Sequence, residues 1–434
     1  MTATSLLPWI LSALPCLGAA LSLLFWSDEE RVRSAALAVT VTSTLLNAGA
    51  AWWQSDLPGG ALFLCLLPLT SFVSLLGQPV HRDNRTAWIL TLLLLGLGLG
   101  SLVVPDPARH LVRIGLLAVV AMAIQRSRRA APTTLRGLIS YGVGMAAGAA
   151  AMLLPGGVGM VAGLIACGTM LPLLPLHAGH VAALTSLPGN LPAFLALVLP
   201  VVGFHQLLPL LPELDPSLRG TVELLALLGA LYGSLRALTS ARTLPLLAYA
   251  SLAFSSLLWW VIATAGAVGP QSAIYLSDCG LAMTGLLLAW YAIRARYGDI
   301  DPRALGGMAY PMPRFSTLFV LLTLAALGMP PFGVFTGFMG LLFDPMFSVR
   351  ASFFLIILAW LSASWYLLTP LQQLVFGPQR TGLRYDDLRH HEVASLVIVL
   401  LLLTVLGTAP ARVFGWSAAP ASPNVAMKGA AWTR

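Results

Sequence analysis

Lysine, and charged side chains in general, are scarce in this chain. Of its 24 basic residues only Lys428 is a lysine, and charged residues account for 9% of the 434 residues. Soluble domains carry about 25% charged residues, so a water-facing globular surface is excluded. Lysine is the basic side chain that loses its charge most readily on burial, which suits it to proton relays inside membranes. Its near absence excludes a relay built on buried lysines.

Motifs for metals, redox cofactors and nucleic acids are also absent. No Cys-x-x-Cys pair occurs, and four cysteines lie far apart inside apolar segments: Cys16, Cys65, Cys167 and Cys279. Neither a zinc site nor a disulfide framework is therefore predicted. The net charge of +8 comes from arginines scattered over short loops, which form no basic face for a nucleic acid. No flavin, haem, quinone or iron–sulfur motif is visible, so we expect no cofactor in this chain and any redox chemistry in its partners.

Long apolar runs dominate what is present. Hydrophobic residues make up 58% of the sequence, and the runs reach the roughly 20 residues that a helix needs to cross the hydrocarbon core. The predicted fold is therefore an all-α polytopic membrane protein. About fourteen apolar segments lie near residues 5–26, 35–53, 61–77, 87–104, 110–125, 137–154, 158–177, 190–211, 220–236, 243–266, 271–293, 314–343, 351–377 and 391–411. The first lacks a preceding basic region and is expected to be a retained helix.

Arginine-rich and arginine-poor loops alternate along these segments. The loops after odd-numbered segments hold seventeen arginines, whereas the intervening short loops hold three, Arg109, Arg219 and Arg350. By the positive-inside rule the rich loops face the cytoplasm. Both termini are therefore predicted on the periplasmic side of a bacterial inner membrane, in agreement with an even number of spans.

Prolines interrupt two of the segments. The seventh runs into Met-Leu-Pro-Leu-Leu-Pro-Leu-His at 170–177, and the twelfth contains Leu-Gly-Met-Pro-Pro-Phe-Gly at 327–333. Broken helices in corresponding halves of a chain point to a transport centre between inverted repeats, whereas simple kinks or loop edges are the alternative. The predicted organisation is helices 1–3 with the start of repeat one in 1–104, a first repeat in 87–211, a second in 220–377, and helix 14 with an external tail in 391–434.

Short motifs in segments 7 to 14 resemble those of one superfamily in order and spacing. Met170–His177 resembles its Lys-x-Pro-x-x-Pro-Leu-His, and Leu247–Leu252 its Leu-Ala-Tyr-Ser-Ser-Ile. Gly306–Met308, Leu327–Gly337 and Trp365–Pro378 resemble its Met-Gly-Gly-Leu, Leu-Gly-Met-Pro and Tyr-Tyr-Leu motifs. The chain is thus identified as a divergent member of the antiporter-like membrane subunits of respiratory complex I, Mrp antiporters and membrane-bound hydrogenases. The resemblance implies fourteen helices, with the seventh and twelfth broken.

The resemblance also implies where a proton path would lie, because the superfamily is thought to pass protons along buried ionisable residues. Carried over by motif, its lysine and glutamate positions fall on uncharged residues: Met170 in segment 7, Val201 in segment 8, Cys279 or Met283 in segment 11, and Phe338 in segment 12. The glutamate of helix 5 falls near Val112–Arg113, where no carboxylate exists. The usual proton path is therefore expected to be largely lost.

Few ionisable groups remain in or beside the spans as candidates for a proton path. They are His177, His180, His205, Glu223, Arg236 and Asp278. A histidine titrates near neutral pH, and a carboxyl within a span is by default a functional-site hypothesis.

Structural roles are the alternative for each candidate. His177 would satisfy the carbonyls freed by the two nearby prolines, and His205 would be a hydrogen-bonded side chain at the membrane interface. Asp278 would be reached by water or an arginine, because it lies about two turns from the start of its segment. Glu223 and Arg236 are expected to be interfacial anchors, and Arg113 is expected to snorkel.

Two functions stay open at this point. The chain is a membrane subunit of a proton- or cation-coupled complex that conducts by a reduced route, or a non-conducting scaffold that anchors a hydrogenase, dehydrogenase or inorganic-carbon uptake protein. In both cases it is at most a non-catalytic subunit, without a predicted metal site, and its partners are other membrane and peripheral subunits and membrane lipid.

Overall fold

A computed structural model describes residues 3–53, 60–78, 84–127, 132–266, 268–298, 301–343, 351–378 and 385–408. Several residues used in the sequence-based predictions lie outside these ranges: Arg82, Arg128, Arg129, Arg350, Arg380, Arg384, Lys428 and the rest of the external tail. The described residues form helices and connecting turns without a β-strand, so the predicted all-α class is confirmed.

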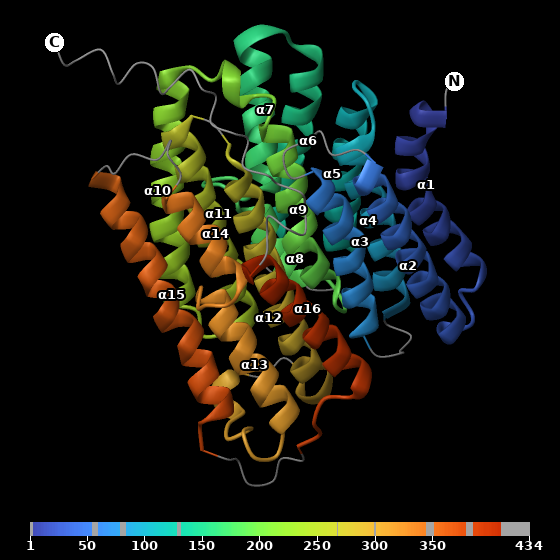
Figure 1. Ribbon diagram of the computed structural model, residues 1–434, viewed down its shortest axis with the longest axis vertical. Helices are drawn as coiled ribbons and strands as arrows, with labels where there is room; N and C mark the ends of the chain where they lie inside the picture. Colours follow the sequence, from blue (N-terminus) through green and yellow to red (C-terminus); the bar gives the residue numbers. More distant parts are fainter. Residues whose placement is uncertain are drawn as a thin grey trace, which may run out of the picture.

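Sixteen α-helices make up this part of the chain (Figure 1). The first eight are α1 (Ala3–Leu24), α2 (Glu29–Trp53), α3 (Gly60–Leu76), α4 (Arg85–Val103), α5 (Ala108–Arg126), α6 (Pro132–Leu153), α7 (Gly156–Met170) and α8 (Ala178–Ser186). The others are α9 (Leu191–Leu207), α10 (Pro216–Leu238), α11 (Thr243–Ala265), α12 (Pro270–Tyr297), α13 (Pro313–Ala326), α14 (Gly333–Leu342), α15 (Ala351–Val375) and α16 (His390–Thr408). Most bounds agree with the predicted segments within a few residues.

Proline starts many of these helices. α10, α12 and α13 begin at Pro216, Pro270 and Pro313. Proline suits the first helical turn because its missing N–H would have no partner there and its φ is already close to the helical value. Proline therefore marks the start of these helices as well as the breaks that follow α7 and α13.

Membrane-spanning character is confirmed by the length and composition of the helices. In the part of the chain that the structure covers, nine helices are long and apolar enough to cross a bilayer: α1, α2, α4, α5, α10, α11, α12, α15 and α16. The apolar windows of α1 and α2 are only 28% buried, so these helices present apolar surface outward, as helices facing lipid do.

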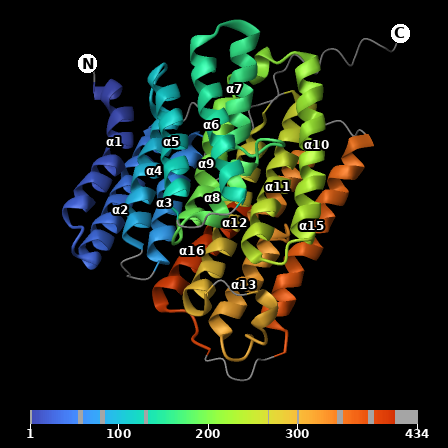
Figure 2. The same cartoon turned by 180° about the vertical axis from the view of Figure 1, so that it is seen from behind.

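The centre of the bundle is built from α9, α11 and α12. The apolar windows of α11 and α12 are 94% and 100% buried, and α12 contacts α9, α11, α13, α14 and α16. Figures 1 and 2 show α12 between the green helices of the first half and the orange helices of the second half. A polar side chain on α12 is therefore surrounded by protein at membrane depth.

Both predicted helix breaks are confirmed. α7 ends at Met170 and the chain resumes as α8, whereas α13 ends at Ala326 and resumes as α14. Pro175 has no N–H to donate to the carbonyl of Leu171, which accepts a hydrogen bond from the Trp259 Nε1–H of α11 at 3.1 Å instead. Helix α8 was not predicted, because its nine residues are too few to be recognised as a span.

An ion pair fastens the end of α12 to the start of α16. Arg296 donates to both carboxylate oxygens of Glu392, at 2.9 and 2.5 Å, and the Glu392 side chain is only 4% exposed. Asp387, just before α16, accepts hydrogen bonds from the backbone N–H groups of Arg314 and Phe315 at the start of α13. These contacts hold three helices of the second half in a fixed arrangement.

Candidate functional site

A histidine lies next to the first helix break, in the buried interior. His180 on α8 is fully buried, and its Nε2 lies 3.0 Å from Ser251 Oγ on α11. Its other ring nitrogen, Nδ1, has no hydrogen-bond partner among the described residues. Buried polar atoms are normally paired, so this unsatisfied nitrogen marks a place where a proton or a water molecule can be accommodated.

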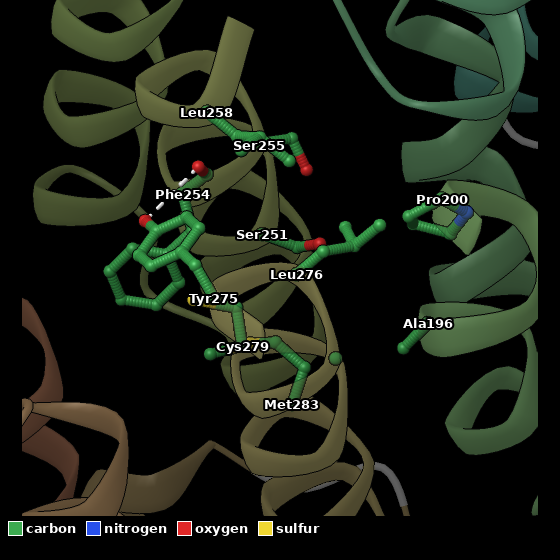
Figure 3. A pocket seen from close by; sticks show the side chains of 11 residues that line it. Ala196, Pro200, Ser251, Phe254, Ser255, Leu258, Tyr275, Leu276, Cys279 and Met283 are labelled. Atoms are coloured by element: carbon green, nitrogen blue, oxygen red, sulfur yellow. Dashed lines mark hydrogen bonds between the residues drawn. The ribbon is translucent and has the colours of Figure 1, made fainter. Parts of the chain in front are cut away.

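A small cavity lies beside Ser251, between α9, α11 and α12 (Figure 3). Its lining includes Ser251 and Ser255 from α11 and Cys279 and Met283 from α12, facing Pro200 of α9. The volume is about 10 Å³, which is about the space that one water molecule needs. Hydroxyl and thiol groups on its wall provide hydrogen-bond partners for such a water.

Asp278 lies on α12, next to the cavity residue Cys279. It is fully buried, and neither of its carboxyl oxygens has a hydrogen-bond partner among the described residues. No arginine among the described residues is bonded to it, and access of water from the start of the helix stays a prediction. The distance of Asp278 from the start of its helix did not predict this burial, because neighbouring helices surround α12 along its whole apolar length.

The carboxyl group of Asp278 faces the N-terminus of α14, the second half of the broken helix. A Cβ atom placed on Gly333, the first residue of α14, would lie 2.1 Å from Asp278 Oδ1. Only glycine allows this approach. Helix N-termini carry partial positive charge and unpaired N–H groups, so the break directs a favourable electrostatic field at the carboxyl group.

His180, Ser251, the cavity and Asp278 are polar features of the buried centre of the bundle, and we call this set the central polar axis; Asp278 itself does not line the cavity. The helix breaks contribute to both of its ends, because His180 follows the break between α7 and α8 and Asp278 faces the break between α13 and α14. The sequence identified His180 and Asp278 as candidates. It did not identify Ser251, since a serine in an apolar run gives no signal of its partner.

The residues onto which the resemblance carries the superfamily's ionisable positions include several packed apolar side chains. Met170 and Val201 are at most 1% exposed, and Met283 lines the small cavity. The Phe338 ring stacks in parallel on Trp360, with ring centroids 4.1 Å apart.

His177 lies outside this small cavity, at the start of α8. Its ring packs edge-on against Tyr232 at a centroid distance of 5.4 Å, and its Nδ1 has no hydrogen-bond partner among the described residues. The carbonyls freed by the nearby prolines have other donors, since Leu173 N–H donates to Gly168 and Trp259 to Leu171. The carbonyls of Gly168 and Leu171 thus have donors other than His177, whose imidazole interacts with the backbone of Pro175.

His205 and Arg113 form a separate buried pair on α9 and α5. Arg113 Nη2 donates to His205 Nδ1 at 3.3 Å and to the Ser101 carbonyl at 3.4 Å. Arg113 is only 5% exposed, so the prediction that it snorkels is wrong. His205 is buried and hydrogen-bonded near the end of α9, and its place at the membrane interface stays a prediction. The backbone carbonyl and the imidazole replace the water that a snorkelling guanidinium would reach.

Glu223 and Arg236 lie far apart along α10 and outside the central polar axis. Glu223 Oε1 accepts a hydrogen bond from Ser352 Oγ at 3.2 Å. The guanidinium of Arg236 lies over the Tyr249 ring, 5.1 Å from its centroid. Among the described residues no group of histidine, cysteine and carboxylate side chains could hold a metal ion.

Comparison with known proteins places this arrangement in a family. Residues 116–365 match the model of the NADH:quinone oxidoreductase/Mrp antiporter transmembrane family. The chain belongs to this family. The matched region includes His180, Ser251 and Asp278, whereas Arg113 precedes it.

Curated relatives agree with this assignment, and solved structures share the fold. The chain is 27% identical over 252 residues to NADH-quinone oxidoreductase subunit M of Escherichia coli (strain K12), covering 56% of this chain and 48% of that protein. It thus spans about half the length of the curated relatives it matches. A chain of respiratory complex I from Thermus thermophilus with bound NADH has a TM-score of 0.76 at 22% identity, covering 93% of this chain and 97% of that one. A chain of an archaeal membrane-bound sulfane sulfur reductase has a TM-score of 0.78 at 16% identity, covering 94% and 95%.

Proposed function

We propose that this chain is a membrane subunit of a multi-subunit, proton- or cation-coupled complex of the NADH:quinone oxidoreductase/Mrp type. The family match and the curated relative from E. coli support this class of complex. Its partners are other membrane and peripheral subunits of that complex, and catalysis belongs to those partners.

The proposed topology has fourteen spans in a bacterial inner membrane. The nine long apolar helices, the three helices α3, α6 and α9, and the two broken helices α7–α8 and α13–α14 add up to this number. The alternation of arginine-rich loops supports periplasmic termini. The two breaks support inverted repeats over 87–211 and 220–377, each broken in its fourth helix.

The proposed route for protons is the central polar axis, entered at His177. From His177 the route leads to His180, one turn further along α8, then to Ser251, a water in the small cavity, and Asp278. The observation that carries this proposal is the Asp278 carboxyl, which is buried without a partner and faces the start of α14. An ionised carboxylate without a partner is costly to bury, so Asp278 is expected to exchange its proton only when water enters the axis.

Proton flux into proteoliposomes that contain the purified complex tests the route. Asp278→Asn keeps the shape of the side chain but removes its exchangeable proton, and flux should fall roughly tenfold or more, as on loss of a positioned acid–base group. His177→Ala should lower flux as well. Glu223→Gln is the matched control, since it neutralises a carboxylate bonded to Ser352 outside the axis and should leave flux unchanged.

A non-conducting scaffold is the competing function, favoured by the tight packing of Met170, Val201 and the Phe338–Trp360 stack. A scaffold predicts that neither Asp278→Asn nor His177→Ala changes the flux of the complex. That result would refute the proposed route while leaving membership of the complex intact. Affinity purification from native membranes tests membership separately: further membrane and peripheral subunits should co-purify, and a chain that purifies alone would contradict it.

A further inference from the structure

A second, larger cavity opens on the outer face of the bundle beside the first helix break. Its volume is about 360 Å³, within the range of roughly 300–1,000 Å³ that ligand sites occupy. It is lined by α6, the 171–177 connection, α8, α10 and α11, which lie side by side on the face seen in Figure 2. It is distinct from the small cavity of the central polar axis, with which it shares no lining residue.

One wall of this outer cavity is apolar and continuous with the outer surface of the protein. Ile139 and Val143 of α6 line it and are 59% and 41% exposed. Leu235 on the neighbouring α10 is also exposed. In a membrane-spanning bundle such outward apolar side chains face lipid chains, so the cavity opens toward the hydrocarbon region and not only toward water.

The rim of the outer cavity carries two exposed arginines. Arg136 lines it directly, and Arg236 lies over Tyr249, whose ring forms part of the wall. Tyr232 and His177 line the cavity as well. Two positive charges therefore lie at one opening, beside the His177 imidazole.

No acidic side chain neutralises this rim. No aspartate or glutamate lines the cavity, and α6, α8 and α11 contain none. The acidic residue on α10 is Glu223, thirteen residues before Arg236 and thus roughly 20 Å away along the helix axis. Neither arginine forms an ion pair with another described residue. The rim thus presents an uncompensated positive charge that is complementary to an anion.

We propose that the outer cavity binds an anionic phospholipid, with the phosphate at Arg136 and Arg236 and an acyl chain along Ile139 and Val143. Basic pockets between membrane helices at the cytoplasmic side bind anionic headgroups, because each exposed arginine there adds electrostatic binding energy to the phosphate. The apolar wall of the cavity would hold the acyl chain of the same lipid. The phenol hydroxyls of Tyr232 and Tyr249 and the His177 imidazole can form hydrogen bonds with the glycerol ester groups, which lie between the phosphate and the acyl chain of the lipid. The inference depends on the proposed membrane orientation but not on proton conduction.

Native mass spectrometry of the full-length chain, titrated with dioleoylphosphatidylglycerol or dioleoylphosphatidylcholine, tests the proposal. We expect retention of phosphatidylglycerol in preference to phosphatidylcholine. Each arginine near a membrane surface contributes about fivefold in affinity, so the double variant Arg136→Gln/Arg236→Gln should bind phosphatidylglycerol roughly 25-fold more weakly. Arg136→Lys/Arg236→Lys keeps the charge and should restore most of the binding.

Two further variants separate this site from general attraction to the membrane surface. Arg126→Gln is the matched control: it removes an exposed arginine at the end of α5 that does not line the cavity, and retention should stay unchanged. Val143→Trp fills the apolar wall and should lower phosphatidylglycerol binding without changing charge. Equal retention of the two lipids, or an equal loss in the Arg126 control, would overturn the proposal. Complete displacement of bound phosphatidylglycerol by millimolar inorganic phosphate would also overturn it. The same holds if a crosslinker placed at position 143 in the complex captures a partner subunit instead of lipid.

Discussion

Replacing Gly333 with alanine tests the contact between the broken helix and Asp278. The added methyl group would meet Asp278 Oδ1 at 2.1 Å and the carboxyl carbon at 2.3 Å, well inside any real contact distance. Both groups lie in the packed centre of the bundle, so neither can move away freely. Over-packing of this kind costs about 1–3 kcal/mol, and we expect Gly333→Ala to destabilise the purified protein by that amount.

A double-mutant cycle isolates the contact from other effects of the substitution. Asp278→Ala removes the carboxyl group, so the Gly333 methyl then has space, and the coupling energy between the two sites should be about 1–3 kcal/mol. Gly142→Ala on α6 is the matched control, because a Cβ there meets nothing within 4 Å. That variant should be neutral or more stable by about 0.5–1 kcal/mol.

Thermal unfolding in detergent, followed by circular dichroism and by the monodisperse fraction on size exclusion, provides the measurement. The reasoning is refuted if Gly333→Ala unfolds at the same temperature as Gly142→Ala. Additive effects of Asp278→Ala and Gly333→Ala would equally show that the carboxyl group does not face the start of α14.

Two further predictions concern contacts that hold the second half of the bundle. Arg296→Ala leaves Glu392 buried without its ion-pair partner and should lower the free energy of unfolding by about 3–5 kcal/mol. Asp28→Asn breaks an exposed ion pair and should lower it by less than about 1 kcal/mol. Similar losses for the two variants in thermal unfolding would contradict this prediction. Phe338→Ala removes the ring stacked on Trp360 and should cost about 3–5 kcal/mol; a variant as stable as the unchanged protein would show that the stack does not pack as described.

Much of the fold could be predicted from the sequence, because the bilayer imposes a simple rule on backbone hydrogen bonds. Apolar runs of span length bounded by charge or proline gave most helix bounds within a few residues. The prolines at 172, 175, 330 and 331 predicted both breaks, because proline has no N–H to donate and therefore interrupts the hydrogen bonds of a helix. Helix α8 was missed because a short helix after a break has neither span length nor end signals.

The candidate site was less predictable, because burial at membrane depth depends on which helices surround a residue. Asp278 was found by residue type alone, but its isolation follows from the complete enclosure of α12 and from the close approach of Gly333. The Arg113–His205 pair shows the same limit. A buried arginine on α5 and a histidine on α9 carry no mutual signal, although the structure brings them within 3.3 Å.

The central claim is that Asp278 exchanges its proton with water that enters the polar axis. Infrared difference spectroscopy of the purified complex, recorded between buffers in ordinary and heavy water, measures this directly. We predict a protonated carboxyl band that shifts on exchange into heavy water and is missing in Asp278→Asn. Identical carboxyl difference spectra for the unchanged complex and Asp278→Asn would contradict the claim.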